Sequence, residues 1–103
     1  LDFGLFTGLF EATYAEARRG LGDDARARKH ALAAIAAMPT APGNEPMVHG
    51  LRTLYLLAKS AGDVDEALKW YEQYTAADQA FSDDRSQRVL AYQMASHESR
   101  ARA

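Results

Sequence analysis

Residues 54–71 read LYLLAKSAGDVDEALKWY, and this stretch decides the fold. Apolar residues spaced by three and four positions precede the Gly62-Asp63 pair, and a second amphipathic run begins directly after it. Such spacing places apolar side chains on one face of a helix. Gly62 suits the left-handed conformation that ends a helix, and Asp63 can cap the next helix, with Glu66 completing a capping box. The stretch therefore predicts a helix, a tight turn and a second helix.

The same pattern occurs earlier in the chain, around Gly22-Asp23. Amphipathic stretches again flank the pair, and either Asp23 or Asp24 can cap the second of them. Two antiparallel helical hairpins are therefore predicted, at about residues 3–38 and 47–80. The link between them, residues 39–46, reads PTAPGNEP and is rich in helix breakers, and its last proline suits the first turn of the following helix.

A fifth helix is predicted for the C-terminal part, at about residues 83–101. Ser82-Asp83-Asp84 resembles a helix start, because acidic side chains are favoured at a helix N-terminus. The apolar residues of this segment are few, and its end is polar, so we expect its far end to project into solvent or to lead to another domain.

Composition restricts the class of protein. The chain has 103 residues, the size of one domain, with 48% hydrophobic and 25% charged residues. Twenty-one alanines and only three prolines favour closely packed helices, so the expected fold class is all-α. The chain does not begin with methionine and stops within a helix-like pattern, from which we expect a fragment of a larger protein.

Several functional classes are disfavoured. The net charge of −2 gives no basic field for nucleic acid or an anionic membrane, and no apolar stretch is long enough to span a bilayer. Cysteine is absent, the three histidines lack zinc-site spacing, and no phosphate loop or nucleophile elbow occurs. We therefore expect no catalytic residue, no metal and no cofactor in this chain, and no nucleic-acid or membrane contact.

The hairpin around Gly62 resembles a tetratricopeptide repeat. That family has a small residue early in its second helix and an aromatic residue four positions later, as Ala67 and Tyr71 are here. In the first hairpin Gly22, Ala27 and Pro39 match the family's turn glycine, small residue and terminal proline, whereas Ala31 and Glu11 depart from its aromatic and large positions. The resemblance implies a right-handed superhelix of two repeats followed by a C-terminal helix.

A second, more specific resemblance involves Tyr74, Asp78, Phe81 and residues 84–93. This segment resembles the last repeat and exit helix of bacterial signalling proteins, in which such repeats precede a diguanylate cyclase, a histidine kinase or a helix-turn-helix domain. This implies a protein-interaction, sensory or dimerisation module whose parent could carry a catalytic output domain. A cytoplasmic location is favoured, and a periplasmic one applies if the parent is a membrane-anchored sensor.

Stacked hairpins form a concave groove lined by the first helix of each pair. The resemblance places Leu9, Ala12, Glu16 and Arg19 of the first hairpin and His49, Arg52, Leu56 and Lys59 of the second on that groove. Its mild basicity would suit a carboxylate or an acidic segment of a protein or peptide. These residues could equally be ordinary solvated helix positions, and the asparagines of the family's carboxylate clamp are missing.

Three further alternatives remain at this point. Trp70 could contact a partner, or it could pack in the core or against the C-terminal helix. Exposed apolar residues at either end could drive a homodimer, namely Phe3, Phe6 and Phe10 or Leu90, Tyr92 and Met94. The repeats could also be a structural scaffold without a ligand, or a regulatory domain attached to a DNA-binding output domain.

Overall fold

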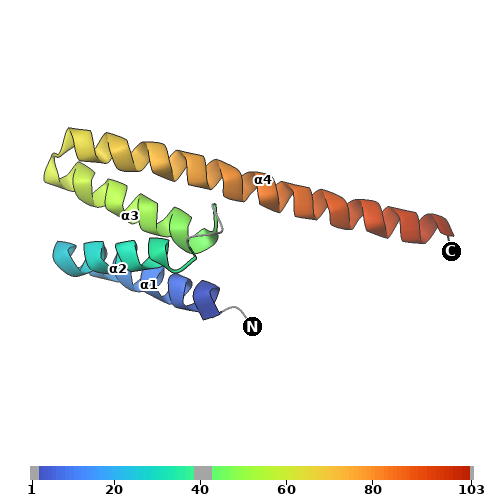
Figure 1. Cartoon of the computed structure of the whole chain (residues 1–103), viewed down its shortest axis with the longest axis horizontal. Coiled ribbons are helices and arrows are strands. Elements are labelled where there is room, and N and C mark those ends of the chain that lie inside the picture. The colour runs from blue at the N-terminus through green and yellow to red at the C-terminus, as the bar shows by residue number, and fades with distance from the viewer. Residues whose placement is uncertain (1–2, 39–42, 103) are drawn as a thin grey trace.

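Four α-helices account for the secondary structure of the residues that the computed structural model describes, 3–38 and 43–102. They are α1 (Phe3–Gly20), α2 (Asp24–Ala36), α3 (Glu45–Ala61) and α4 (Val64–Arg102). These ranges contain no strand, so the prediction of an all-α fold is confirmed. Figure 1 shows α1 and α2 side by side, α3 against them, and α4 running along α3 and then far beyond it.

The two turns form as the Gly-Asp pairs predict. Gly22 and Gly62 have φ angles of 79° and 77°, which only glycine adopts without steric cost. The carboxylates of Asp23 and Asp63 each accept a hydrogen bond from the backbone N–H three residues on, at 3.3 and 3.1 Å. Each such cap stabilises a helix by about 1 kcal/mol. The Glu66 side chain does not return to the turn to complete a capping box but bonds elsewhere.

The start of α3 uses a cap that the sequence analysis did not identify. Asn44 Oδ1 accepts the backbone N–H of Met47 at 2.9 Å, while Asn44 Nδ2 donates to the Met38 carbonyl at 3.1 Å. Pro46 lies in the first turn of α3, as expected. The earlier residues of the predicted link, 39–42, lie outside the described residues.

The prediction of a separate fifth helix is wrong, because α4 is one helix of 39 residues. The expected break at Ser82-Asp83-Asp84 contains no glycine or proline, and serine and aspartate only weakly disfavour a helix interior. Pairs four residues apart also hold the turn in place. Gln79 Nε2 donates to Asp83 Oδ1 at 2.9 Å, and Arg88 Nη2 lies 3.0 Å from Asp84 Oδ2. The predicted helix of residues 83–101 is thus the second half of α4.

Small residues bring the helices together in the core. Ala27, Ala31 and Ala34 of α2 are fully buried, and Gly50 of α3 lies against the same helix. The larger core side chains come mostly from α3, with Leu51, Leu54 and Leu57, and from α4, with Trp70. Among the described residues α4 packs along α3, and it also reaches α2 through the ion pair between Glu66 and Arg28. A helix rises 1.5 Å per residue, so the second half of α4 extends past the end of α3.

Candidate functional site

A groove between α1 and α3 is the candidate functional site. It has a volume of about 560 Å³ and is open to solvent along one side. Five of the eight groove residues expected from the sequence line it: Leu9, Ala12, Glu16, His49 and Arg52. They meet because α1 and α3 pack directly against each other. On each helix the lining residues lie three or four positions apart, and so on one face.

The Glu16 carboxylate is the most strongly held charge in the groove. Arg19 donates to it through Nη2 at 2.5 Å and Nε at 3.3 Å, and the buried Thr53 hydroxyl donates across from α3 at 3.4 Å. The hydrogen bond from Arg19 is the main reason why the pKa of Glu16 lies below its usual value of 4.5; the bond from Thr53 and the charge of Arg52 act in the same direction, and partial burial opposes them. Glu16 is therefore ionised and already satisfied by the protein.

Arg52 is the cation that the groove leaves unpaired. Within the described ranges no carboxylate forms an ion pair with it, whereas Arg19 is bonded to Glu16. His49 lies one turn earlier on the same face of α3, with Nε2 at 3.6 Å from Glu45 Oε1. An anionic group entering the groove would meet the Arg52 guanidinium, which can bind a carboxylate through two parallel hydrogen bonds. Next to it, Leu9 and Ala12 offer apolar contacts.

The remaining predicted contact residues lie outside the groove lining. Arg19 adjoins it only through Glu16. Leu56 is half-buried, and Lys59 is exposed with its Nζ 6.0 Å from the centre of the Tyr55 ring. Trp70 belongs to the core, with 9% of its surface exposed and its Nε1 donating to Glu66 at 3.1 Å. Trp70 therefore packs in the core, and not against the C-terminal segment, which continues its own helix.

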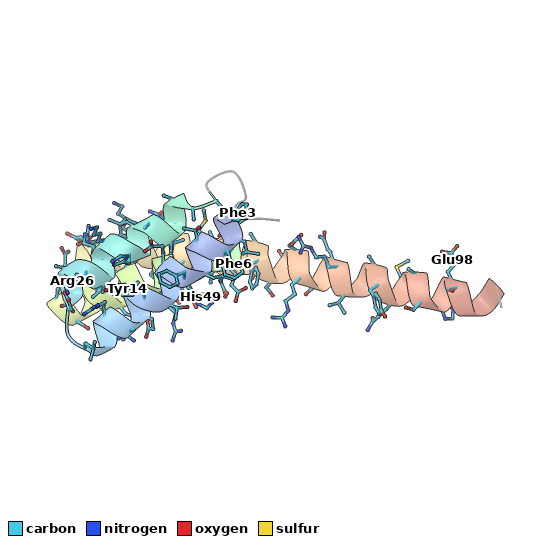
Figure 2. All side chains as sticks on the ribbon, turned by 90° about the horizontal axis from the view of Figure 1, so that it is seen from below. Phe3, Phe6, Tyr14, Arg26, His49 and Glu98 are labelled. Carbon is cyan, nitrogen blue, oxygen red and sulfur yellow. The ribbon has the colours of Figure 1, made fainter. Side chains whose placement is uncertain are left out.

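The residues considered for self-association are exposed. Phe3, Phe6 and Phe10 have 72%, 78% and 69% of their surface accessible, and Figure 2 shows Phe3 and Phe6 on the outer side of α1. Leu90, Tyr92 and Met94 lie on the projecting half of α4, away from the other helices.

Four further residues that the sequence did not single out line the groove: Thr13, Ala17, Glu45 and Thr53. Helical spacing could have found all four of them. Thr13 and Ala17 follow Leu9 at four-residue steps, and Glu45 precedes His49 by one turn, so they share a face with residues that were predicted. Thr53 likewise follows His49 by four residues. Only its hydrogen bond to Glu16 could not be predicted, because that bond depends on the approach of α1 to α3.

Comparisons with protein-family models, with curated proteins and with solved structures find no match for this chain. Its function is therefore argued from its own geometry. In the described part of the chain, no helix is both long and apolar enough to cross a membrane. Nor does any group of three or more histidine and acidic side chains there lie close enough together to hold a metal ion.

Proposed function

We propose that this chain is a protein-interaction module that binds a segment of a partner protein in the groove between α1 and α3. The observation that carries the proposal is the convergence of Leu9, Ala12 and Glu16 of α1 with His49 and Arg52 of α3 around one open groove. The groove combines an apolar floor with Arg52, which forms no close ion pair with the described residues, while its two carboxylates have partners: Arg19 and Thr53 for Glu16, and His49 for Glu45. Arg52 and the apolar floor suit a segment that presents an acidic side chain next to small apolar residues.

We also propose that the two hairpins are tetratricopeptide-like repeats from a bacterial signalling protein. The left-handed glycines, the aspartate caps and the buried alanines of α2 support this reading, because a repeat of that family needs a tight turn and small residues between its helices. Under this proposal, binding in the groove acts on α3, and α4, which packs along α3, carries the change toward an output domain.

Peptide selection tests the groove proposal. A display library of random peptides is selected against the whole chain, and the affinity of the enriched peptides is measured by fluorescence anisotropy. We expect the enriched peptides to contain an acidic residue beside small apolar ones. Arg52→Glu should weaken their binding by about tenfold or more, the usual cost of reversing a charge that contacts a ligand. Ala17→Trp, which fills the groove from an exposed position, should weaken it as well.

Lys29→Glu is the matched control, because Lys29 is an exposed cation of α2 outside the groove lining, and its reversal makes the same change in net charge. It should leave the affinity within about twofold. Peptides that bind the Arg52 and Ala17 variants as tightly as the original chain would contradict the groove proposal. A selection that enriches no peptide would favour the scaffold alternative, in which the repeats hold no ligand.

A further inference from the structure

One face of α4 remains uncovered along most of the helix. Near its start, Val64, Leu68 and Tyr71 expose 76%, 57% and 45% of their surface, and one side of the Tyr71 ring packs against Tyr55 of α3 at 5.1 Å between ring centres. In the projecting half, Val89 and Tyr92 expose 51% and 75%. Together with the residues between them these five positions follow steps of three and four residues, so they lie on one continuous stripe, which we call the α4 stripe.

The α4 stripe has the spacing of a coiled-coil seam. Its positions fall into two interleaved series with a period of seven residues, and such a period keeps one face turned toward a partner helix through a left-handed supercoil. Between the apolar ends lie the exposed residues Thr75, Asp78, Ser82 and Arg85. The stripe is therefore apolar at both ends and polar in the middle.

The polar middle carries two charges of opposite sign. Within the described ranges, neither Asp78 nor Arg85 forms a side-chain hydrogen bond or ion pair. They are seven residues apart, about 10 Å along the helix axis, which is too far to pair within one helix. A second helix could bring opposite charges together at both positions.

We propose that the α4 stripe binds the α4 stripe of a second copy of this chain in an antiparallel pair. In the register in which each residue of the stripe faces one residue of the other stripe, Leu68 lies opposite Tyr92 of the second copy, and Tyr71 lies opposite Val89 of the second copy. By symmetry each of these contacts occurs twice, so the projecting half of each α4 covers the exposed start of the other. The surface is self-complementary, as a two-fold dimer requires.

The charges decide the direction of the pair. In the antiparallel arrangement Asp78 of one copy lies beside Arg85 of the other, and the reciprocal pair forms on the other side of the two-fold axis. In a parallel, in-register pair Asp78 would face Asp78 and Arg85 would face Arg85, and like charges across a seam are unfavourable. The same two residues thus favour one orientation and oppose the other.

Size and shape also suit a second copy. The molecule is 59 Å along its longest axis but only 28 and 24 Å along the others, because α4 projects from the body. Contact along the length of α4 would bury on the order of 800 Å² per copy, the area of a standard stable interface. The body of each copy packs on α4 through α3, at Trp70 and Ala77, and these core positions lie on a different side of the helix from the stripe.

Charge reversal tests the pairing. Sedimentation of the whole chain over about 1–100 µM, a range around a micromolar dissociation constant, should show a monomer–dimer equilibrium. Asp78→Arg and Arg85→Asp should each raise the dissociation constant by about tenfold, because each brings like charges together across the seam. The double variant Asp78→Arg with Arg85→Asp should return it to within about threefold of the original value, since the opposite charges are restored.

Leu90 and Met94 provide the control, because both are exposed on the projecting half of α4 but lie on the side opposite the stripe. Leu90→Gln and Met94→Gln should leave the dissociation constant unchanged, whereas Leu68→Gln should raise it. A chain that stays monomeric throughout the concentration range would overturn the proposal. So would a double charge reversal that fails to restore dimerisation, or control variants that weaken it as much as Leu68→Gln does.

Engineered cysteines test the orientation, since the chain has none of its own. A Tyr71→Cys chain mixed with a Val89→Cys chain should form a disulfide-linked dimer between the two different chains under mild oxidation. The Tyr71→Cys chain alone should remain uncrosslinked. Crosslinking of Tyr71→Cys to itself would show a parallel pair and would contradict the antiparallel arrangement.

Discussion

Gly50 is a helical position at which a single added methyl group would disturb the packing of α3 against α2. A Cβ atom built there would lie 2.7 Å from the Ala31 carbonyl oxygen and 2.9 Å from Cγ1 of Ile35. The first of these is a backbone atom, so α3 would have to move away from α2. We expect Gly50→Ala to lower the free energy of unfolding by about 1–3 kcal/mol, although alanine is the better helix former. Urea unfolding followed by Trp70 fluorescence measures the change.

Gly20→Ala is the matched control. Gly20 is the last residue of α1, and a Cβ there would meet nothing within 4 Å. The same substitution should leave stability unchanged or raise it by up to about 1 kcal/mol, because alanine restricts the unfolded chain more than glycine does. If Gly50→Ala proved as well tolerated as Gly20→Ala, the close approach of α3 to α2 at this point would be wrong.

Glu66 joins the two hairpins through a charge that depends on pH. Its Oε1 accepts hydrogen bonds from Arg28 Nη1 of α2 at 2.8 Å and from Trp70 Nε1 at 3.1 Å. These bonds, that from Arg28 first, hold the pKa of Glu66 below its usual value of 4.5. A carboxyl whose folded-state pKa is lowered stabilises the fold above its unfolded-state pKa, and this contribution disappears as the pH falls through the lowered value. Glu66→Gln should therefore lower the urea midpoint at pH 7, and the difference from the original chain should shrink below pH 4.5.

Glu72→Gln is the comparison for this pH series, because Glu72 is an exposed carboxylate on the same helix. We expect the urea midpoint of the Glu72→Gln variant to equal that of the original chain at every pH, since both chains keep the Glu66 contacts. A constant difference between the Glu66 variant and the original chain from pH 7 to pH 3 would show that the Arg28 and Trp70 contacts do not depend on the charge of Glu66.

The structural roles of some residues can be predicted from the local sequence, whereas the roles of others depend on a residue that is distant in the sequence. Gly62 and Asp63 could be predicted because a turn with a capped helix after it has its own signature in sequence. The need for glycine at position 50 could not be predicted, because it arises from the carbonyl of Ala31, nearly twenty positions away. The Thr53 hydroxyl, which bonds Glu16 across the groove, is hidden in sequence for the same reason.

At the scale of the elements, α4 consists of a supported half and an unsupported half. Its first half packs on α3, while the projecting half touches no other helix among the described residues. Gln87→Pro, at an exposed position of the projecting half, should therefore break the helix locally without reaching the core, since proline in a helix interior costs about 3 kcal/mol. We expect circular dichroism to show a loss of helix, while the urea midpoint reported by Trp70 stays the same. Both are measured at one low protein concentration, so that self-association does not contribute.

Gln73→Pro is the counterpart in the supported half. Gln73 is also exposed, but the turn around it carries Trp70 and Ala77, which are core residues. Breaking that turn should lower the free energy of unfolding by about 3 kcal/mol or more. Equal losses of stability from the two prolines would mean that the projecting half of α4 contributes to the stability of the body.

The predicted number of helices was wrong because residues 82–84 suit both a helix start and a helix interior. Ser82, Asp83 and Asp84 are typical of a helix start, but they are merely tolerated in a helix interior, and sequence spacing does not separate these two cases. The decision rests on the bonds from Gln79 to Asp83 and from Arg88 to Asp84, which support continuation. A glycine or proline marks a break far more reliably, as the turns at Gly22 and Gly62 show.

For the whole molecule, the central fact is that neither hairpin has a complete core of its own. Ala31 and Ala34 of α2 are fully buried, and the backbone of Ala31 lies against Gly50 of the second hairpin. Leu51 and Leu54 of α3 are buried as well, between the other helices that α3 contacts. Separation of the hairpins would expose these apolar surfaces, and the free energy of that exposure couples the two units.

This coupling predicts that the body unfolds in one transition. His30 reports on the first hairpin, because its ring lies edge-on to the Tyr14 ring at 4.3 Å and its Nδ1 pairs with Glu11. Trp70 reports on the second hairpin from within the core. We expect the NMR signals of the His30 ring and the fluorescence of Trp70 to give the same urea midpoint, as a two-state transition requires. An earlier midpoint for His30 would show that α1 and α2 open while α3 and α4 remain packed, and the groove, which needs α1 as one wall, would then be lost before the rest of the fold.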